Sequence, residues 1–155
     1  MVRLRDLPQY ERDHLLSKNL PPLGPPVWVQ PSRPTTELRF ALITTAGLHY
    51  RDAAAFELAD ATFRPIDGQA DPNELVMSHT SVNFDKSGFV DDVNVVFPLT
   101  RFRELIERGV VGSLAEVHYS FMGAGLQPSA YESGAAQVAG LLKQDRVDAV
   151  FLTPV

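Results

Sequence analysis

Two short segments of this sequence carry groups that could take part in chemistry. His79 ends a predicted strand, where an imidazole could orient a carboxylate or transfer a proton. Thr44, Thr45 and Gly47 form a small-residue turn after another predicted strand, where amides and hydroxyls could hold a carboxylate or phosphate. The alternatives are a histidine bonded to local backbone and a tight strand-to-helix connection. We predict His79 as a catalytic group and the turn as part of a substrate-binding site.

The other polar candidates favour structural roles. His118 alternates with apolar neighbours in a predicted strand, which favours a histidine that faces the covering helices. Asp91, Asp92 and Asn94 could offer oxygen ligands to a hard cation, but their spacing matches no such ligand pattern, so capping of a loop or helix is favoured. We predict no metal site. We also assign no role to two histidines that lack a partner at metal-ligand spacing, His14 and His49.

The chain contains no cysteine. This excludes disulfides, thiolate metal sites and cysteine nucleophiles within the 155 residues. Any redox chemistry must therefore come from a group that lies outside this sequence.

Composition indicates one ordinary globular domain. The chain has 155 residues, of which 45% are hydrophobic and 21% charged, enough apolar material for one core. A net charge of -5 without a Lys/Arg cluster argues against a nucleic-acid partner. No apolar run is long enough to span a bilayer, and the N-terminus lacks the apolar run of a secretory signal. We expect a cytoplasmic protein that does not enter a membrane.

Proline content divides the chain into an arm and a body. Six of the twelve prolines lie between Pro21 and Pro34, where fixed φ angles and missing N–H groups disfavour regular structure. Residues 1–36 are predicted as an arm, with a short helix from Asp6 to about Asn19 and with Trp28 anchored on the body. The arm could be a ligand for an aromatic groove on another protein. Packing on its own domain or on a sister subunit is favoured, because no PxxP repeat recurs.

Residues 37–155 are predicted as the N-terminal portion of an α/β domain. Apolar runs and alternation predict strands over 39–45, 62–66, 74–79, 116–122 and 147–153. Amphipathic spacing and capping signals predict helices over 52–60, 98–108 and 129–144. The third helix opens with a capping box, Ser129 to Glu132, and turns Tyr131, Ala135, Val138 and Leu142 inward.

Alternating strands and helices predict a three-layer domain with a mostly parallel sheet of flavodoxin/Rossmann-like type. The final strand is a near-continuous apolar run, which is typical of a central parallel strand covered on both faces. Ligands of such sheets bind beyond the carboxyl ends of the strands. The loops to search are therefore those after Thr45, His79, Phe121 and Thr153.

Six segments occur in a characteristic order and spacing. They are TTAGLH (44–49), SH (78–79), DDVNVVFPLTRFREL (91–105), GVVGSL (109–114), HYSFMG (118–123) and VDAVFLTPV (147–155). Each is weak alone, but the ordered set, from about Trp28 to Val155, resembles the selenoprotein B subunits of the glycine/sarcosine/betaine/D-proline reductase family.

The resemblance implies an oxidoreductase in which selenocysteine, or cysteine in some members, directly follows the final strand segment. We therefore expect selenocysteine at position 156, and a chain truncated at its UGA codon that is itself inactive in redox chemistry. A nucleophile at this edge would be stabilised as an anion by the N-terminus of the next helix. Family members use such a selenol for reductive C–N cleavage of glycine, sarcosine, betaine or D-proline. They work with partner reductase subunits and a thioredoxin-like reductant.

One alternative function comes from another class. A non-catalytic module of flavodoxin-like type would hold a small anion in the loops after Thr45 and His79, or would use the arm for assembly. In either case we expect a homo-oligomer, because a truncated sheet leaves apolar surface on its last strand.

Overall fold

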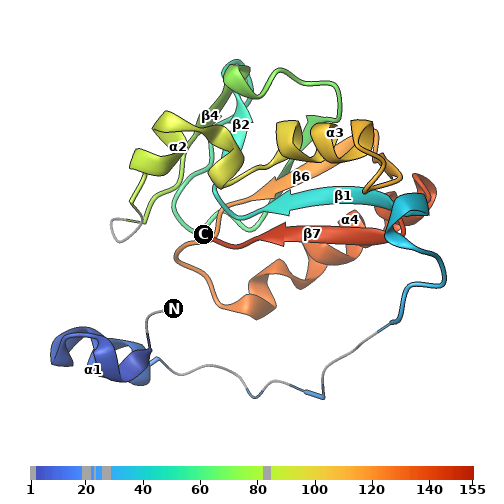
Figure 1. The fold of residues 1–155 in the computed structure, drawn as a ribbon. Helices are drawn as coiled ribbons and strands as arrows, with labels where there is room; N and C mark the ends of the chain where they lie inside the picture. Colours follow the sequence, from blue (N-terminus) through green and yellow to red (C-terminus); the bar gives the residue numbers. More distant parts are fainter. Residues whose placement is uncertain (1–2, 19–21, 23, 26–28, 82–84) are drawn as a thin grey trace.

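The computed structural model describes residues 3–18, 22, 24–25, 29–81 and 85–155, so the predicted anchor Trp28 lies outside the described residues. Its body contains a five-stranded sheet organised around β1 (Arg39–Thr44) (Figure 1). β7 (Ala149–Thr153) pairs in parallel with β1 along one edge. β5 (Ser113–Leu114) and then β6 (Val117–Phe121) pair in parallel with the start and the end of β1. β1 is therefore the central strand.

The α/β class is confirmed, but the sheet is mixed rather than mostly parallel. β3 (Phe63–Asp67) runs antiparallel to β6. β2 (Leu48–Tyr50) and β4 (Leu75–Met77) form a separate antiparallel pair, so the strand predicted over 74–79 lies outside the main sheet. A parallel neighbour needs a long crossover, usually a helix. No helix forms between β1 and β3, and β3 accordingly runs in the opposite direction.

The helix predicted over 52–60 does not form, and the segment is irregular. Arg64 of β3 holds it in this course. Its Nε donates to the Ala54 carbonyl at 2.9 Å and its Nη2 to the Ala55 carbonyl at 3.2 Å. The guanidinium also lies 4.2 Å from the ring centre of Phe56. One cation thus takes the carbonyls that a helix would use internally, and the alanine-rich sequence does not reveal this.

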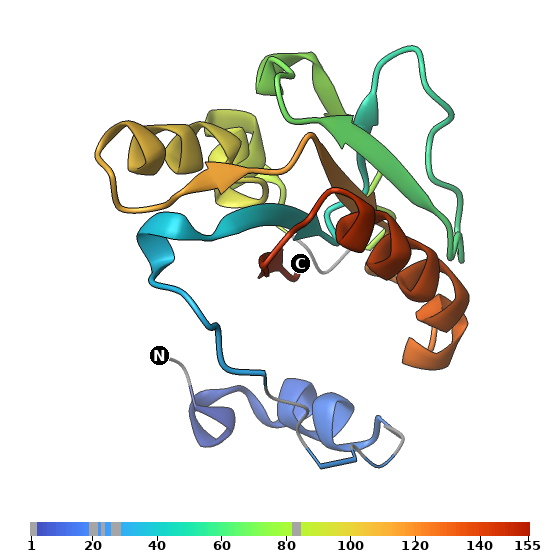
Figure 2. The same cartoon turned by 90° about the vertical axis from the view of Figure 1, so that its right-hand side faces the viewer.

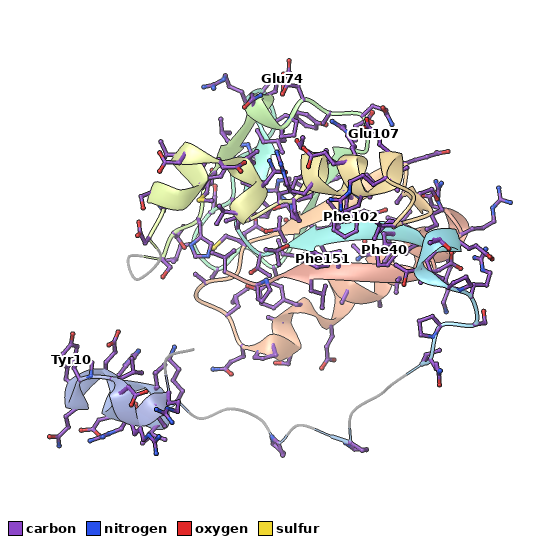
Figure 3. The ribbon with its side chains drawn as sticks, viewed as in Figure 1. Tyr10, Phe40, Glu74, Phe102, Glu107 and Phe151 are labelled. Atoms are coloured by element: carbon purple, nitrogen blue, oxygen red, sulfur yellow. The ribbon has the colours of Figure 1, made fainter. Side chains whose placement is uncertain are left out.

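α3 (Leu99–Glu107) covers one face of the sheet and confirms the helix predicted over 98–108. Gly109 follows it at a φ of 67°, the left-handed conformation expected of a helix stop. Phe102 of this helix packs between Phe40 of β1 and Phe151 of β7, with ring centroids 5.6 and 5.2 Å away (Figure 3). This aromatic cluster joins helix and sheet.

α4 (Glu132–Gln144) covers the other face beneath β6 and β3, mainly through Val138 (Figure 2). Its start differs from the prediction: a 3-10 turn over Pro128–Tyr131 precedes it, and no capping box forms at Ser129. Gly134 is buried instead of Ala135, which is exposed. A Cβ at Gly134 would lie only 3.3 Å from a neighbouring carbonyl oxygen, so glycine permits this close packing.

β7 is an edge strand in the part of the chain that the structure describes, not the predicted central strand. It pairs with β1 alone over five residues. Phe151 packs toward α3, but Leu152 on the opposite face is 65% exposed, because α4 lies beneath β6 and β3. The apolar run that predicts a central strand therefore belongs to a strand with an uncovered face.

α1 (Gln9–Leu16) lies apart from the body in Figure 1, and none of its residues is buried. It begins after Pro8 without a side-chain cap; Asp6, the predicted cap, bonds the Arg3 amide at 3.2 Å instead. Arg33 ties the following segment to the body by an ion pair of 2.6 Å with Asp148, just before β7. Within the described residues, every helix is too short or too polar to cross a membrane.

His118 fills the gap along β1 between its pairing with β5 and its pairing with β6. The register shifts by two residues between the pairs Phe40–Leu114 and Ile43–Tyr119, as at a β-bulge. At this gap the Leu42 amide donates to His118 Nδ1 at 3.1 Å. The side chain is fully buried, and burial lowers the pKa of His118 to about 4. The structure thus supports the structural role that the sequence favours.

Replacing His118 tests this role. In His118→Leu the Leu42 amide loses its acceptor, and we expect the free energy of unfolding at pH 7 to fall by about 1–3 kcal/mol. The pH dependence should change as well. A base whose pKa is about 4 when folded and near 6.5 when unfolded binds protons more readily in the unfolded chain. Wild-type stability therefore falls between pH 6.5 and 4, and the leucine variant lacks this component.

Urea unfolding of both proteins from pH 4 to pH 7 measures the two effects. The structural role of His118 would be contradicted if the leucine variant had the wild-type free energy of unfolding at pH 7 and the wild-type dependence of this free energy on pH.

Candidate functional site

The carboxyl ends of β1, β6 and β7 meet at one edge of the sheet, where Figure 1 also places the C-terminus. The Thr45 amide donates to the Thr153 carbonyl at 3.2 Å, and the Gly123 amide donates to the Thr45 carbonyl at 2.8 Å. Thr45 thus joins the loops that follow all three strands. Because ligands of parallel strands bind beyond their carboxyl ends, this edge is the candidate site.

Gly47 brings the segment after β4 to the same edge. Its amide donates to the Phe121 carbonyl at 2.9 Å, and its carbonyl accepts from the Ser78 amide at 2.9 Å. Its φ is 66°, and a Cβ would lie 3.1 Å from the His79 amide nitrogen. Only glycine combines this backbone conformation with so close an approach. The predicted catalytic histidine and the predicted binding turn are therefore neighbours.

The polar groups of the predicted binding turn are used within the protein. Thr44 is fully buried, and its hydroxyl accepts from the Ala46 amide at 3.1 Å and donates to the Thr153 carbonyl at 3.4 Å. The Gly47 amide is also bonded, as described above. The Thr45 hydroxyl accepts from the Val155 amide at 2.8 Å. These bonds organise the edge, and substrate binding by the three residues stays a prediction.

His79 is 3% exposed at this edge. Its Nδ1 accepts from the Ser81 amide at 3.3 Å, which places the proton of the neutral ring on Nε2. The Lys86 ammonium donates to the His79 carbonyl at 2.7 Å. Burial first, and the charge of Lys86 second, lower the pKa of His79. The ring is therefore neutral near pH 7, the state in which an imidazole can accept a proton.

His49 makes contacts that sequence analysis missed. Its Nδ1 lies 2.7 Å from the Tyr50 carbonyl and must donate to it, which leaves Nε2 to accept from the Ser78 hydroxyl at 2.6 Å. The ring is 4% exposed and packs edge-on against Phe56. His49 thus fixes the residue before His79. No sequence signal could reveal the pair, because it depends on the antiparallel pairing of β2 with β4, which the pattern did not predict.

The acidic loop before α3 caps local structure. Asp92 Oδ1 accepts from the Asn94 amide at 2.9 Å, and this bond lowers the pKa of Asp92. Asn94 Oδ1 accepts from the Thr100 amide at 3.1 Å, in the first turn of α3. Asp91 is the last residue of α2 (Ser87–Asp91). Over the described ranges, no cluster of three or more histidine or acidic side chains could hold a metal ion.

A polar groove of about 650 Å³ lies at the opposite, amino edge of the sheet. Arg39 on its wall forms an ion pair with Asp145, whose other oxygen accepts from the Glu116 amide at 2.7 Å. Asp148 accepts from the Arg39 amide at 2.8 Å. These charges are paired with each other across strand ends, so we assign them to the scaffold.

Comparison with known proteins gives one family and one curated relative. The family model described as "glycine/sarcosine/betaine reductase selenoprotein B" matches residues 31–155. The D-proline reductase subunit gamma of Acetoanaerobium sticklandii is 35% identical over 136 residues, which cover 86% of this chain and 55% of that protein. The chain thus spans about half the length of this relative. No solved structure matches.

The substitution Lys86→Met separates the two causes of the lowered His79 pKa, which are burial and the charge of Lys86. Removing the nearby charge should raise the pKa of His79, but not to the ordinary value of 6.5, because burial is the larger cause. The chemical shift of the His79 Cε1 proton as a function of pH measures it. Lys143→Met, an exposed change on α4, is the control that should have no effect. An unchanged pKa in Lys86→Met would remove Lys86 from the site.

Proposed function

Since the chain belongs to the glycine/sarcosine/betaine reductase selenoprotein B family, we propose that it is the front part of an oxidoreductase subunit that cleaves a C–N bond. The proposed substrates are small amines of the amino-acid type: glycine, sarcosine, betaine or D-proline. The relative named D-proline reductase subunit gamma supports this substrate class. As one subunit among others, the protein would act with partner reductase subunits.

The redox group of the proposal is a selenocysteine or cysteine directly after Val155. The family resemblance of residues 147–155 gives this position. The observation that carries it is the place of Val155, whose amide is bonded at 2.8 Å to Thr45 at the edge where three parallel strands end. A nucleophile there would have His79 on the neighbouring segment.

The proposed chemistry needs two electrons and two protons for each C–N bond. The selenol or thiol loses its proton to Nδ1 of the neutral His79 imidazole, which gives up its hydrogen bond from the Ser81 amide, and the resulting anion attacks the carbon that bears nitrogen. The nitrogen leaves with the proton from His79. A second thiol then attacks the selenium or sulfur, and the carbon departs with that thiol's proton. A thioredoxin-like dithiol supplies the two electrons by reducing the bond formed and becomes a disulfide.

Self-association through β7 is a further part of the proposal. Its uncovered face exposes Leu152 by 65% and Val150 by 37%. An edge strand with apolar side chains can pair with a second copy. We expect the 155-residue chain to be a dimer or larger in light scattering, and Leu152→Lys to shift it toward monomer. Val95 is similarly exposed but lies beside α3, away from β7, so Val95→Lys should leave the molar mass in light scattering unchanged. A stable wild-type monomer would contradict this part.

The nucleotide sequence beyond codon 155 is the first test of the redox function. An in-frame UGA followed by further coding sequence supports it. An ordinary stop codon with no reading frame beyond it would overturn the proposed position of the redox group.

The second test uses the full-length protein with its partner subunits and a dithiol, and measures amine release from the four substrates. We expect serine at position 156 to abolish release. His79→Gln should slow it by about 10²–10⁴-fold without changing Tm, because a proton-transfer group is lost. His14→Gln, an exposed change on α1, is the matched control. Full activity in His79→Gln would remove that residue from the mechanism.

A further inference from the structure

The Thr45 side chain holds Val155 at two points. Its hydroxyl accepts from the Val155 amide at 2.8 Å and lies 3.4 Å from an oxygen of the Val155 carboxyl group, to which it donates. The Val155 side chain packs against the hydrophobic core on the α3 side of the sheet. Amide, carboxyl group and side chain of Val155 are thus all held. A threonine hydroxyl has one proton to donate, and this contact uses it.

Gly123 fixes the Thr45 side chain from the other side. A Cβ at Gly123 would lie 2.8 Å from both Cβ and Oγ1 of Thr45, closer than real Cβ atoms approach. The Gly123 amide also donates to the Thr45 carbonyl at 2.8 Å. Because threonine is stiff about χ1, a backbone packed this closely restricts the direction of its hydroxyl. The orientation of the Thr45 side chain therefore does not depend on its contact with Val155.

We propose that Thr45 is a positioning residue that sets the direction in which the chain leaves β7. In a longer chain this carboxyl oxygen becomes the carbonyl oxygen of a peptide bond, and it then lies in the same plane as the nitrogen and Cα of the next residue. A hydroxyl bonded to that oxygen orients the plane, and with it the Cα that follows about 3.8 Å beyond the Cα of Val155. This inference rests on the proposed function of position 156. Thr45 then aims the redox side chain, instead of binding substrate.

The first test measures hydrogen exchange of the Val155 amide in the 155-residue chain, where position 156 plays no part. Thr45→Val keeps the shape but removes the hydroxyl, and we expect exchange about five to ten times faster. Thr45→Ser should exchange close to the wild-type rate. Thr153→Val is the matched control at the same edge, because its buried hydroxyl has no hydrogen-bond partner among the described residues. It should leave the exchange rate unchanged.

The second test uses the longer reading frame with cysteine encoded at position 156. The rate of alkylation by iodoacetamide as a function of pH gives the pKa of this thiol. Thr45→Val should move the midpoint toward the ordinary value of about 8.5, because the thiolate leaves its stabilised position. Thr45→Ser should restore the wild-type profile. Gly123→Ala, which displaces Thr45 without deleting its hydroxyl, should change the profile in the same direction as Thr45→Val.

The two tests separate the inference from the proposed function. If the cysteine at position 156 titrates as an ordinary thiol, in a protein that releases no amine, the proposed function fails, while the exchange experiment still decides whether Thr45 holds Val155. An active protein whose Thr45→Val variant keeps the wild-type exchange rate and alkylation profile would overturn the inference.

Discussion

The hydrogen bonding of β1 on both of its edges is the constraint on which the rest of the structure depends. β5 and β6 occupy one edge and β7 the other, so β1 lies between β5 and β7 at its amino end and between β6 and β7 at its carboxyl end. At the amino end, Arg39 forms an ion pair with Asp145, and its amide donates to Asp148. At the carboxyl end there is a set of short turns around Thr45. The charges at one end of the central strand are paired, and the candidate site lies at the compact turns of the other end.

This arrangement explains why small residues gather where the strands end. Thr44, Thr45 and Gly47 are predicted from the sequence as a ligand-binding turn, and in the structure their amides and hydroxyls bond neighbouring segments. Such a turn contributes rigidity, and rigid support is what a reactive group needs in order to be held at a fixed angle. His79 differs from them, because its buried ring is a titratable group at the same edge. In the proposed function this edge is the place of the redox group.

The sequence predicts features that depend on local periodicity, and misses those that depend on distant partners. α3 is found because its apolar spacing and Gly109 are local signals. The loops of the candidate site are found because strand ends follow from apolar runs. The irregular course of residues 52–60 depends on Arg64, and the contact between His49 and Ser78 depends on the unpredicted pairing of β2 with β4. The edge position of β7 and the antiparallel β3 are decided by strand order, which apolar runs do not encode.

The position of β1 in the chain has a consequence for synthesis. Asp148, which bonds the Arg39 amide at the start of the β1–β7 pairing, follows it by 109 residues. At about 5–20 residues per second, a ribosome takes on the order of 5–20 seconds to make this interval. The apolar residues of β1 leave the ribosome long before the residues of β7, which pair with them along one edge. The β1–β7 pairing can form only after this interval has been translated, so this edge of the central strand stays unpaired until then.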